Sequence, residues 1–330
     1  MRNSFNARQR SLSGALIFLV LAALSCRSSA PRTGGSPEFL QLQVTPVPLD
    51  PQDTRRQRLG SFAYAGGIEI RVATPGAVLE LSDVRVVSDD RLIAVSDDGS
   101  FFEARLLFDP RDRLSGLANA RLTRLRDEYG GDLKSSNADA EGLEVLPGGD
   151  RLVSFEGEPR IWRYPGATGV PRPVAKPAAT FPANEGFEAI TSYPSAGRDA
   201  YLVGIEGGSI WLCRLEATCV QTDFGRFVPP EHGLTGLSVY GDDGAFAMLA
   251  RAWDEVRGNR ISVKLIETSG APDGRVRDEM TIARPLTVDN FEGIVAVRRA
   301  SGLRLYLLSD DNGRATQHTY LLAFDWEPGA

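Results

Sequence analysis

Three acidic phrases that contain a glycine recur along this chain of 330 residues. They read Asp139-Ala-Glu-Gly-Leu143, Asn184-Glu-Gly-Phe-Glu-Ala-Ile190 and Asp289-Asn-Phe-Glu-Gly-Ile294. After a turn, each phrase is followed by an apolar run that ends in an acid, and these acids are Glu156, Glu206 and Asp310. Because repeated units place equivalent residues at equivalent positions, we expect carboxylates from distant segments to meet.

The repeat makes Glu141, Glu188 and Glu292 equivalent, and Asp97 and Asp310 fall on a second set of equivalent positions. Carboxylates that lie close together repel one another, and a hard cation or a basic partner relieves the repulsion. Sites made of oxygen ligands favour Ca²⁺ or Mg²⁺ over zinc. We therefore predict a Ca²⁺ site formed by these five residues.

One copy of the repeat departs from the others. It ends in Ala245-Phe-Ala-Met-Leu-Ala-Arg251, so Arg251 stands where the other copies carry an acid. Carboxylates, one arginine and a cation suit hydrolysis of phosphate esters or lactones, because the cation polarises the ester oxygen and a carboxylate activates water. The predicted catalytic residues are Glu141, Glu188, Glu292 and Arg251.

Two other interpretations of the acidic phrases stay open. The same phrases are typical of tight turns, in which a carboxylate caps backbone N–H groups and glycine adopts a positive φ. Catalysis without a metal is the third interpretation. Nucleophilic catalysis has little support, because the sequence has no Gly-x-Ser-x-Gly motif, and His232 and His318 are typical of surface or hydrogen-bonded structural histidines.

The elements that must position these residues are short strands. Apolar runs alternate with Gly, Asp, Pro and Asn turns from about Glu38 onward, and the one segment that resembles a helix is Leu117–Asp127. The later strand of each copy begins near residues 92, 151, 201, 245 and 304, a spacing typical of β-propeller blades.

We predict an all-β fold, a β-propeller with six blades, and an irregular β-sandwich is the alternative. In the predicted closing blade, the first strand (Phe39–Val44) pairs with the last (Tyr320–Trp326), so that no sheet edge stays free. The four tryptophans are predicted to lie in blade cores, with an aromatic platform at the channel mouth as the alternative; they are Trp162, Trp211, Trp253 and Trp326.

The first residues predict export. Arg2, Arg8 and Arg10 precede a short apolar run, and the segment 1–26 is interpreted as a signal peptide whose Cys26 lies in a lipobox-like sequence. Cleavage after Ala30 and an uncleaved anchor are the alternatives. Residues 27–37 are a polar Gly/Pro/Ser tether, and residues 38–330 are the propeller domain.

Composition limits the partners. The net charge of −6, with no compensating Lys/Arg cluster, argues against nucleic acid. Cys213 and Cys219 flank a turn between two short strands, which in an exported chain predicts a cross-strand disulfide, with free buried thiols as the alternative.

The motifs together resemble the phytase-like domain family, "esterase-like activity of phytase". They appear in the expected order along most of the chain: Arg58–Phe62, Ala94–Gly99, Asp139–Leu143, Asn184–Ile190, Asn290–Ile294 and Leu308–Asn312. One departure is Ala250-Arg251, where the family commonly has Glu-Arg. The resemblance implies an exported β-propeller.

We expect a Ca²⁺-dependent hydrolase of phosphate or carboxylate esters, acting on a small molecule as a monomer. The expected location is the periplasm or the outer membrane, with Cys26 as the lipid anchor and no other membrane contact. The alternative is a non-catalytic envelope lipoprotein that uses the propeller to bind a ligand or a protein.

Overall fold

Short antiparallel strands follow one another through the described part of the chain. The computed structural model describes residues 37–74, 77–88, 90–134, 137–181, 185–268, 274–314 and 316–329, which belong to one unit, Thr33–Ala330. In these ranges no helix is long and apolar enough to cross a membrane. The signal segment, Cys26, Ala30, Asn184 and nearly all of the tether lie outside the described residues, so the predicted limits of these segments stay predictions.

Three blades are each made of four consecutive antiparallel strands. Their strands are β9 (Ala140–Val145), β10 (Arg151–Phe155), β11 (Arg160–Tyr164) and β12 (Arg172–Pro173); β13 (Ala189–Ser192), β14 (Ala200–Gly204), β15 (Ile210–Arg214) and β16 (Ala217–Gln221); and β17 (Gly233–Val239), β18 (Phe246–Asp254), β19 (Gly258–Glu267) and β20 (Arg275–Ala283). Two short 3₁₀ helices lie in described parts of the connections, η2 (Pro194–Ala196) and η3 (Asp223–Phe227).

Two further blades flank these three. The first consists of β5 (Leu81–Val86), β6 (Arg91–Ser96), β7 (Ser100–Phe108) and β8 (Leu114–Arg124). The fifth combines β21 (Asn290–Arg299), β22 (Gly302–Asp310) and β23 (Thr319–Trp326) with β4 (Phe62–Val72), which comes from the N-terminal part of the sequence. A single pair, Gly66 with Leu114, links the first and fifth blades through their outer strands.

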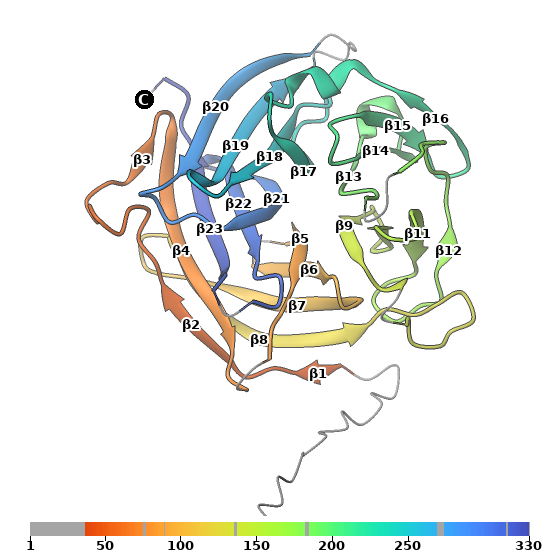
Figure 1. Ribbon diagram of the computed structural model, residues 1–330, viewed down its shortest axis with the longest axis horizontal. Coiled ribbons are helices and arrows are strands. Elements are labelled where there is room, and N and C mark those ends of the chain that lie inside the picture. Colours follow the sequence, from red (N-terminus) through yellow and green to blue (C-terminus); the bar gives the residue numbers. More distant parts are fainter. Residues whose placement is uncertain are drawn as a thin grey trace, which may run out of the picture. The chain divides into compact units, whose positions relative to one another are not determined.

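The blades are arranged in a closed ring. The first strand of each blade contacts the first strands of both neighbouring blades, in the order β5, β9, β13, β17, β21 and back to β5, as Figure 1 shows around the centre of the ring. This arrangement is a β-propeller, and the predicted all-β fold class is confirmed.

Two details of the predicted propeller differ from the structure. The described strands form five blades, so the predicted count of six is not confirmed. The partner of the last strand is β4 and not Phe39–Val44: β23 pairs with β4, with Leu321 opposite Ile68. The earlier segment forms β2 (Leu42–Pro46), which covers the outer edge of β4, and the short β1 (Glu38–Phe39), which pairs with β8. A further partner of β4, β3 (Arg58–Leu59), forms a tight hairpin with it.

The helix predicted at Leu117–Asp127 is wrong, because residues 117–124 of this segment lie in β8. Its alanine, leucine and arginine residues favour a helix locally, but pairing with β7 along the whole strand overrides that preference. Asn119 has a φ of 55°, and the pairing slips between Glu103 and Arg105, so the segment contains a β-bulge.

The apolar cores lie between neighbouring blades. One core combines Ile68 and Leu321 of the fifth blade with Leu81 and Phe102 of the first. Another combines Leu202 of the third blade with Phe246 of the fourth. Burial of such side chains stabilises each blade against the next, by roughly 1.5–3 kcal/mol for each large apolar side chain.

The tryptophans divide into two groups. Trp162 and Trp326 are buried as predicted, and Trp211 packs partly buried against a core between the second and third blades. Trp253 of β18 is 63% exposed, so the prediction of a core position is wrong for this residue.

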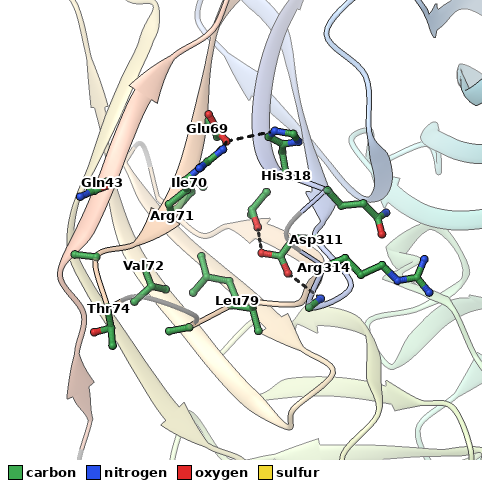
Figure 2. Close-up of a pocket in the computed structure, with 16 residues that line it drawn as sticks. Gln43, Glu69, Ile70, Arg71, Val72, Thr74, Leu79, Asp311, Arg314 and His318 are labelled. Atoms are coloured by element: carbon green, nitrogen blue, oxygen red, sulfur yellow. Dashed lines mark hydrogen bonds and ion pairs between the residues drawn. The ribbon is translucent and has the colours of Figure 1, made fainter.

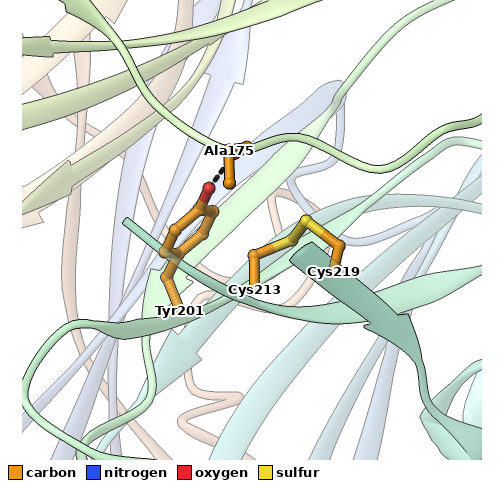
Figure 3. Close-up of a disulfide and its surroundings, with 4 residues drawn as sticks. All are labelled: Ala175, Tyr201, Cys213 and Cys219. Carbon is orange, nitrogen blue, oxygen red and sulfur yellow. Dashed lines mark hydrogen bonds between the residues drawn. A yellow bond between two sulfur atoms is a disulfide. The ribbon is translucent and has the colours of Figure 1, made fainter. Parts of the chain in front are cut away.

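A disulfide joins Cys213 of β15 to Cys219 of β16, which confirms the predicted bridge. The two strands form a hairpin at the outer edge of the third blade, where β16 is mostly exposed. Figure 3 shows the bridge beside Tyr201, whose hydroxyl donates to the carbonyl oxygen of Ala175. The bridge therefore closes an edge hairpin that buries little apolar surface of its own.

Candidate functional site: an acidic centre on the propeller axis

The recurring glutamates occupy β-bulges at the start of the innermost strands. The pairing of each first strand with the second skips one residue, and the skipped residues are Ser82, Glu141, Thr235 and Glu292. Glu188 has the same position in the third blade, because its N–H donates to Gly204, the residue that pairs with Ala189. A bulge re-aims its side chain, so these five residues form a ring on the axis.

The glycine that follows the acid has a separate role. A Cβ atom at Gly142 would lie 3.0 Å from the carbonyl oxygen of Glu188, and one at Gly293 would lie 3.1 Å from that of Ser82. Both contacts are to the innermost strand of the next blade. The Glu-Gly phrase therefore combines an acid on the axis with the space that lets two blades approach closely.

A second layer of polar residues lies beside the bulges. The N–H of Asp97 donates to Glu80 over 3.0 Å, and that of Glu156 donates to Asp139 over 2.9 Å. In the fifth blade Asp310 pairs with Asn290. The corresponding position in the fourth blade holds Arg251, which pairs with Gly233.

The five predicted metal ligands lie around one centre, but the group whose oxygen atoms are close enough for one ion includes only two of them, Asp97 and Glu141, so Glu188, Glu292 and Asp310 stay predictions as ligands. We use the name acidic centre for seven of the carboxylates whose negative charges raise one another's pKa values here: Glu80, Asp97, Asp139, Glu141, Glu188, Glu292 and Asp310. Asp97, Asp139 and Glu141 each present an oxygen atom, and these atoms lie within 4.8 Å of one another. Sequence reasoning did not select Glu80 and Asp139, although both stand two residues before a bulge residue.

Burial and mutual repulsion raise the pKa values across the acidic centre. Burial, followed by the charge of Asp310, raises the pKa of Asp97 to about 8. Burial, followed by the charge of Glu292, raises the pKa of Asp310 to about 8. The pKa values of Glu141 and Glu188 are raised well above the usual range for the same two reasons.

Arg251 opposes this effect at one point of the ring. Its Nη2 atom lies 3.5 Å from Oε1 of Glu292, and its Nη1 donates to Asn290, which itself donates to Oε1 of Glu292 over 2.8 Å. Burial raises the pKa of Glu292 to about 7, and the charge of Arg251 lowers it against that rise. The predicted proximity of Arg251 to the acids is therefore observed, although its catalytic role stays a prediction.

The side chain of Arg85 spans the propeller axis, on the side of the bulges toward which the innermost strands run. It lies three residues beyond Ser82 on β5 and donates to carbonyl oxygens of three other innermost strands, at Ile190, Leu237 (3.0 Å) and Ile294 (3.1 Å). Its Nε atom lies 3.2 Å from Glu144 of β9, so this one guanidinium contacts all five blades.

The counterion of Arg85 is Asp83, 3.0 Å away and buried. Asp83 also accepts from the N–H of Leu143 over 2.9 Å. Sequence reasoning missed this group, because Asp-Val-Arg in β5 has no counterpart in the other blades. We infer that the acidic centre is open on the side of Glu80 and Asp139 and closed on the side of Arg85.

The acidic centre fits a hard divalent cation. Its donors are carboxylate oxygens, which Ca²⁺ and Mg²⁺ prefer, and the oxygen atoms of Asp97, Asp139 and Glu141 lie at separations that one ion can bridge. Ser82 donates to Asp97, which fixes that carboxylate in place. A bound cation would also offset the repulsion that raises the pKa values.

The two histidines lie away from the acidic centre. His232 contacts the carbonyl oxygen of Pro230 through Nδ1 over 2.9 Å, which matches a structural role. His318 lies 3.2 Å from Asp289 through Nδ1 and 3.9 Å from Glu69 through Nε2. Figure 2 shows it at the edge of a pocket of about 500 Å³ between β4 and the loop that precedes β23.

The fold and the site define a five-bladed β-propeller with a carboxylate cluster on its axis. The family model described as "Phytase-like: Esterase-like activity of phytase" matches residues 77–313, which cover all five innermost strands. The chain belongs to this phytase-like family, as the resemblance of its motifs indicated.

Comparisons with single proteins are more distant. No curated protein matches the chain. Among solved structures, the major Malassezia sympodialis allergen Mala s 1 has 13% identity and a TM-score of 0.44, with 82% of this chain and 91% of that chain covered. The calcium-binding protein regucalcin from Agrobacterium tumefaciens has 14% identity and a TM-score of 0.41, with 81% and 87% covered.

Proposed function

We propose that the protein is an exported hydrolase of phosphate or carboxylate esters that uses a divalent cation, with Ca²⁺ preferred, held by the acidic centre. The observation that carries the proposal is the convergence of Asp97, Asp139 and Glu141, whose oxygen atoms lie within 4.8 Å of one another. The family description, which refers to esterase-like activity of phytase, supports the class of reaction.

The position of each residue in the acidic centre suggests its role in the reaction. Asp97, Asp139 and Glu141 would hold the cation, which when bound polarises an ester oxygen. Glu292 is the best candidate for the general base that takes a proton from water, because its pKa of about 7 suits proton transfer near neutral pH. Arg251 and Asn290 fix the orientation of Glu292 through its Oε1 atom. Glu188, on the neighbouring bulge, adds negative charge to the cation site.

A metal analysis combined with an activity screen tests this function. The purified protein is assayed for bound Ca²⁺ and Mg²⁺ and for hydrolysis of a panel of carboxylate and phosphate esters, with and without excess chelator. Glu292→Gln should lower turnover by about a hundredfold or more while the protein stays folded, as expected for removal of an acid–base group. Glu188→Gln should also lower turnover, because it removes negative charge from the cation site. Glu216→Gln, in an exposed turn, is the matched control. Full activity in excess chelator would contradict the proposal.

A second candidate function has one observation in its favour. In the fourth blade, Thr235 and Gly233 occupy the positions that carry acids in the second blade, so the ring is not acidic all round. A non-catalytic envelope protein that uses this asymmetric face to bind a ligand or a protein would need no complete acid set. Cation binding without turnover of any ester in the panel would favour this function over the first.

We also propose that the mature protein is tethered to a membrane through a lipid on Cys26 and is otherwise a monomer that contacts no nucleic acid. The basic, then apolar, then small-residue order of residues 1–26 supports the export step. Cys26→Ser should release the protein from the membrane fraction of cells that express it. Retention of the variant in that fraction would contradict the anchor.

A further inference from the structure

A pocket of about 470 Å³ lies directly beside the acidic centre and has the opposite charge. Its lining includes three arginines, Arg251, Arg284 and Arg314, together with Trp253 and Asn290. Arg251 and Asn290 are the residues that contact Glu292, so they form the wall between the pocket and the acidic centre. The chain as a whole has a net charge of −6, so the three arginines give this pocket a charge opposite to that of the whole protein.

Two of these arginines have a positive charge that can bind an anionic ligand. Arg284 and Arg314 are exposed, and neither forms an ion pair with a carboxylate among the described residues. Figure 2 shows Arg314 extended away from the other labelled residues of the neighbouring pocket. Arginines without a carboxylate partner can bind an oxyanion through two parallel hydrogen bonds.

The one acid in the lining, Asp289, is engaged elsewhere. Its Oδ2 accepts from the backbone N–H of His318 over 3.0 Å and lies 3.2 Å from the His318 ring. Its Oδ1 accepts from the backbone N–H of Asn290 over 2.9 Å. This carboxylate is therefore held by other donors and leaves the pocket positive.

Trp253 adds an apolar surface to the same pocket. It lies two residues beyond Arg251 on β18 and is 63% exposed, so its ring can stack on a flat or apolar group without any rearrangement of the blade core. The pocket thus combines a cationic end with an aromatic side. This combination suits a small organic ligand that has both an anionic group and an apolar body.

We propose that this pocket binds an oxyanion group, phosphoryl or carboxylate, of a small organic ligand whose body packs against Trp253. Arg284 and Arg314 bind the oxyanion, and Arg251 is a positioning residue that connects the ligand to Glu292. The assignment of this ligand as the substrate of the acidic centre rests on the proposed function, whereas oxyanion binding by the pocket does not. A substrate of this kind would carry an anionic group besides the ester that is cleaved.

Isothermal titration at low salt, with protein that has been stripped of cations by a chelator and then dialysed free of it, tests the binding step alone. Inorganic phosphate and acetate are the two oxyanion probes, and the one that binds more tightly identifies the group. Arg284→Gln and Arg314→Gln should each weaken the tighter interaction about tenfold or more, as expected for loss of charge-assisted hydrogen bonds. Arg111→Gln is the matched control, because Arg111 is exposed and its neighbour Asp112 contacts Arg299 at the far end of β21. No saturable binding of either anion, or equal weakening by all three substitutions, would overturn the proposal.

The aromatic side of the pocket has its own test. Phenyl phosphate should bind the unsubstituted protein more tightly than inorganic phosphate, and Trp253→Ala should remove this advantage while it leaves inorganic phosphate binding unchanged. Equal binding of the two phosphates before substitution would overturn the role of Trp253. These titrations need neither cation nor turnover. Anion binding by a protein that hydrolyses no ester of the panel in the presence of Ca²⁺ would therefore count against the proposed function and leave the pocket assignment standing.

Discussion

The Nη2 atom of Arg251 lies 3.5 Å from Oε1 of Glu292 and thereby joins the fourth blade to the fifth across the acidic centre. The same guanidinium lines the neighbouring cationic pocket. Arg251 thus lies between two sites of opposite charge, and its removal should affect each site in a different way.

Arg251→Gln should move the pH dependence of cation binding to higher pH. Arg251 lowers the pKa of Glu292, which is about 7, so its loss lets that carboxyl keep its proton at a higher pH. Calcium titrations at a series of pH values would show the shift of the midpoint. Arg251→Lys, which keeps the charge, should shift the midpoint less, and an unchanged midpoint in the glutamine variant would contradict the contact with Glu292.

The protein without a cation should become less stable as the pH rises. The pKa values of Asp97 and Asp310 are about 8, against about 3.9 for an aspartate in an unfolded chain. Between these values the folded state binds more protons than the unfolded state, so this contribution to stability is complete below about pH 4 and is lost as the pH rises through 8.

Thermal unfolding in chelator should show this loss as a fall in Tm of about 5 °C between pH 6 and pH 9. Excess Ca²⁺ should restore most of it at pH 9, because a ligand of the folded state stabilises that state. The double variant with Asp97→Asn and Asp310→Asn is the control, and its Tm should depend less on pH. A Tm that rises across this range in chelator would refute the assignment.

Arg85→Met should destabilise the whole propeller. The substitution leaves Asp83 and Glu144 buried without their cation and leaves carbonyl oxygens of several blades without a donor. Removal of one partner of a buried ion pair costs about 3–5 kcal/mol. Urea unfolding should show this loss, whereas Arg71→Met, at an exposed pair with Glu69, should change stability by less than about 1 kcal/mol. Equal stabilities of the two variants would contradict the role of Arg85.

Reduction of the Cys213–Cys219 bridge should lower stability moderately. The bridge joins cysteines six positions apart, and closure of so short a loop contributes about 2 kcal/mol. The double variant with Cys213→Ser and Cys219→Ser should therefore match the reduced protein in thermal unfolding. Since the bridge lies on the β15–β16 hairpin and not on the axis, ester hydrolysis at room temperature should be unchanged; a loss of activity would show a role beyond stability.

The repeat predicted the fold class and the meeting of Glu141, Glu188 and Glu292, because equivalent residues of a cyclic repeat must surround one axis. It did not predict that five blades close the ring. The partner of the last strand, β4, resembles several other apolar runs, and strand pairing over such sequence distances leaves no local pattern.

The groups that break the repeat could not be predicted in the same way. Arg85 has no equivalent in the other blades, and its position on the axis follows only from the closed ring. The cationic pocket combines Arg284, which follows β20, with Arg314, which precedes β23. These residues are distant in sequence and belong to no common motif, so the pocket is visible only in three dimensions.

The pairing of β4 with β23 has a consequence for the order in which the protein is made. Synthesis produces β4 early, yet its partner in the fifth blade follows only after the strands of the other four blades. During this interval the growing chain holds an apolar strand with an unfilled hydrogen-bonding edge, which is a site for aggregation. The strands β2 and β3 precede β4 but pair with its opposite edge, so the edge that awaits β23 stays open until the ribosome completes the ring.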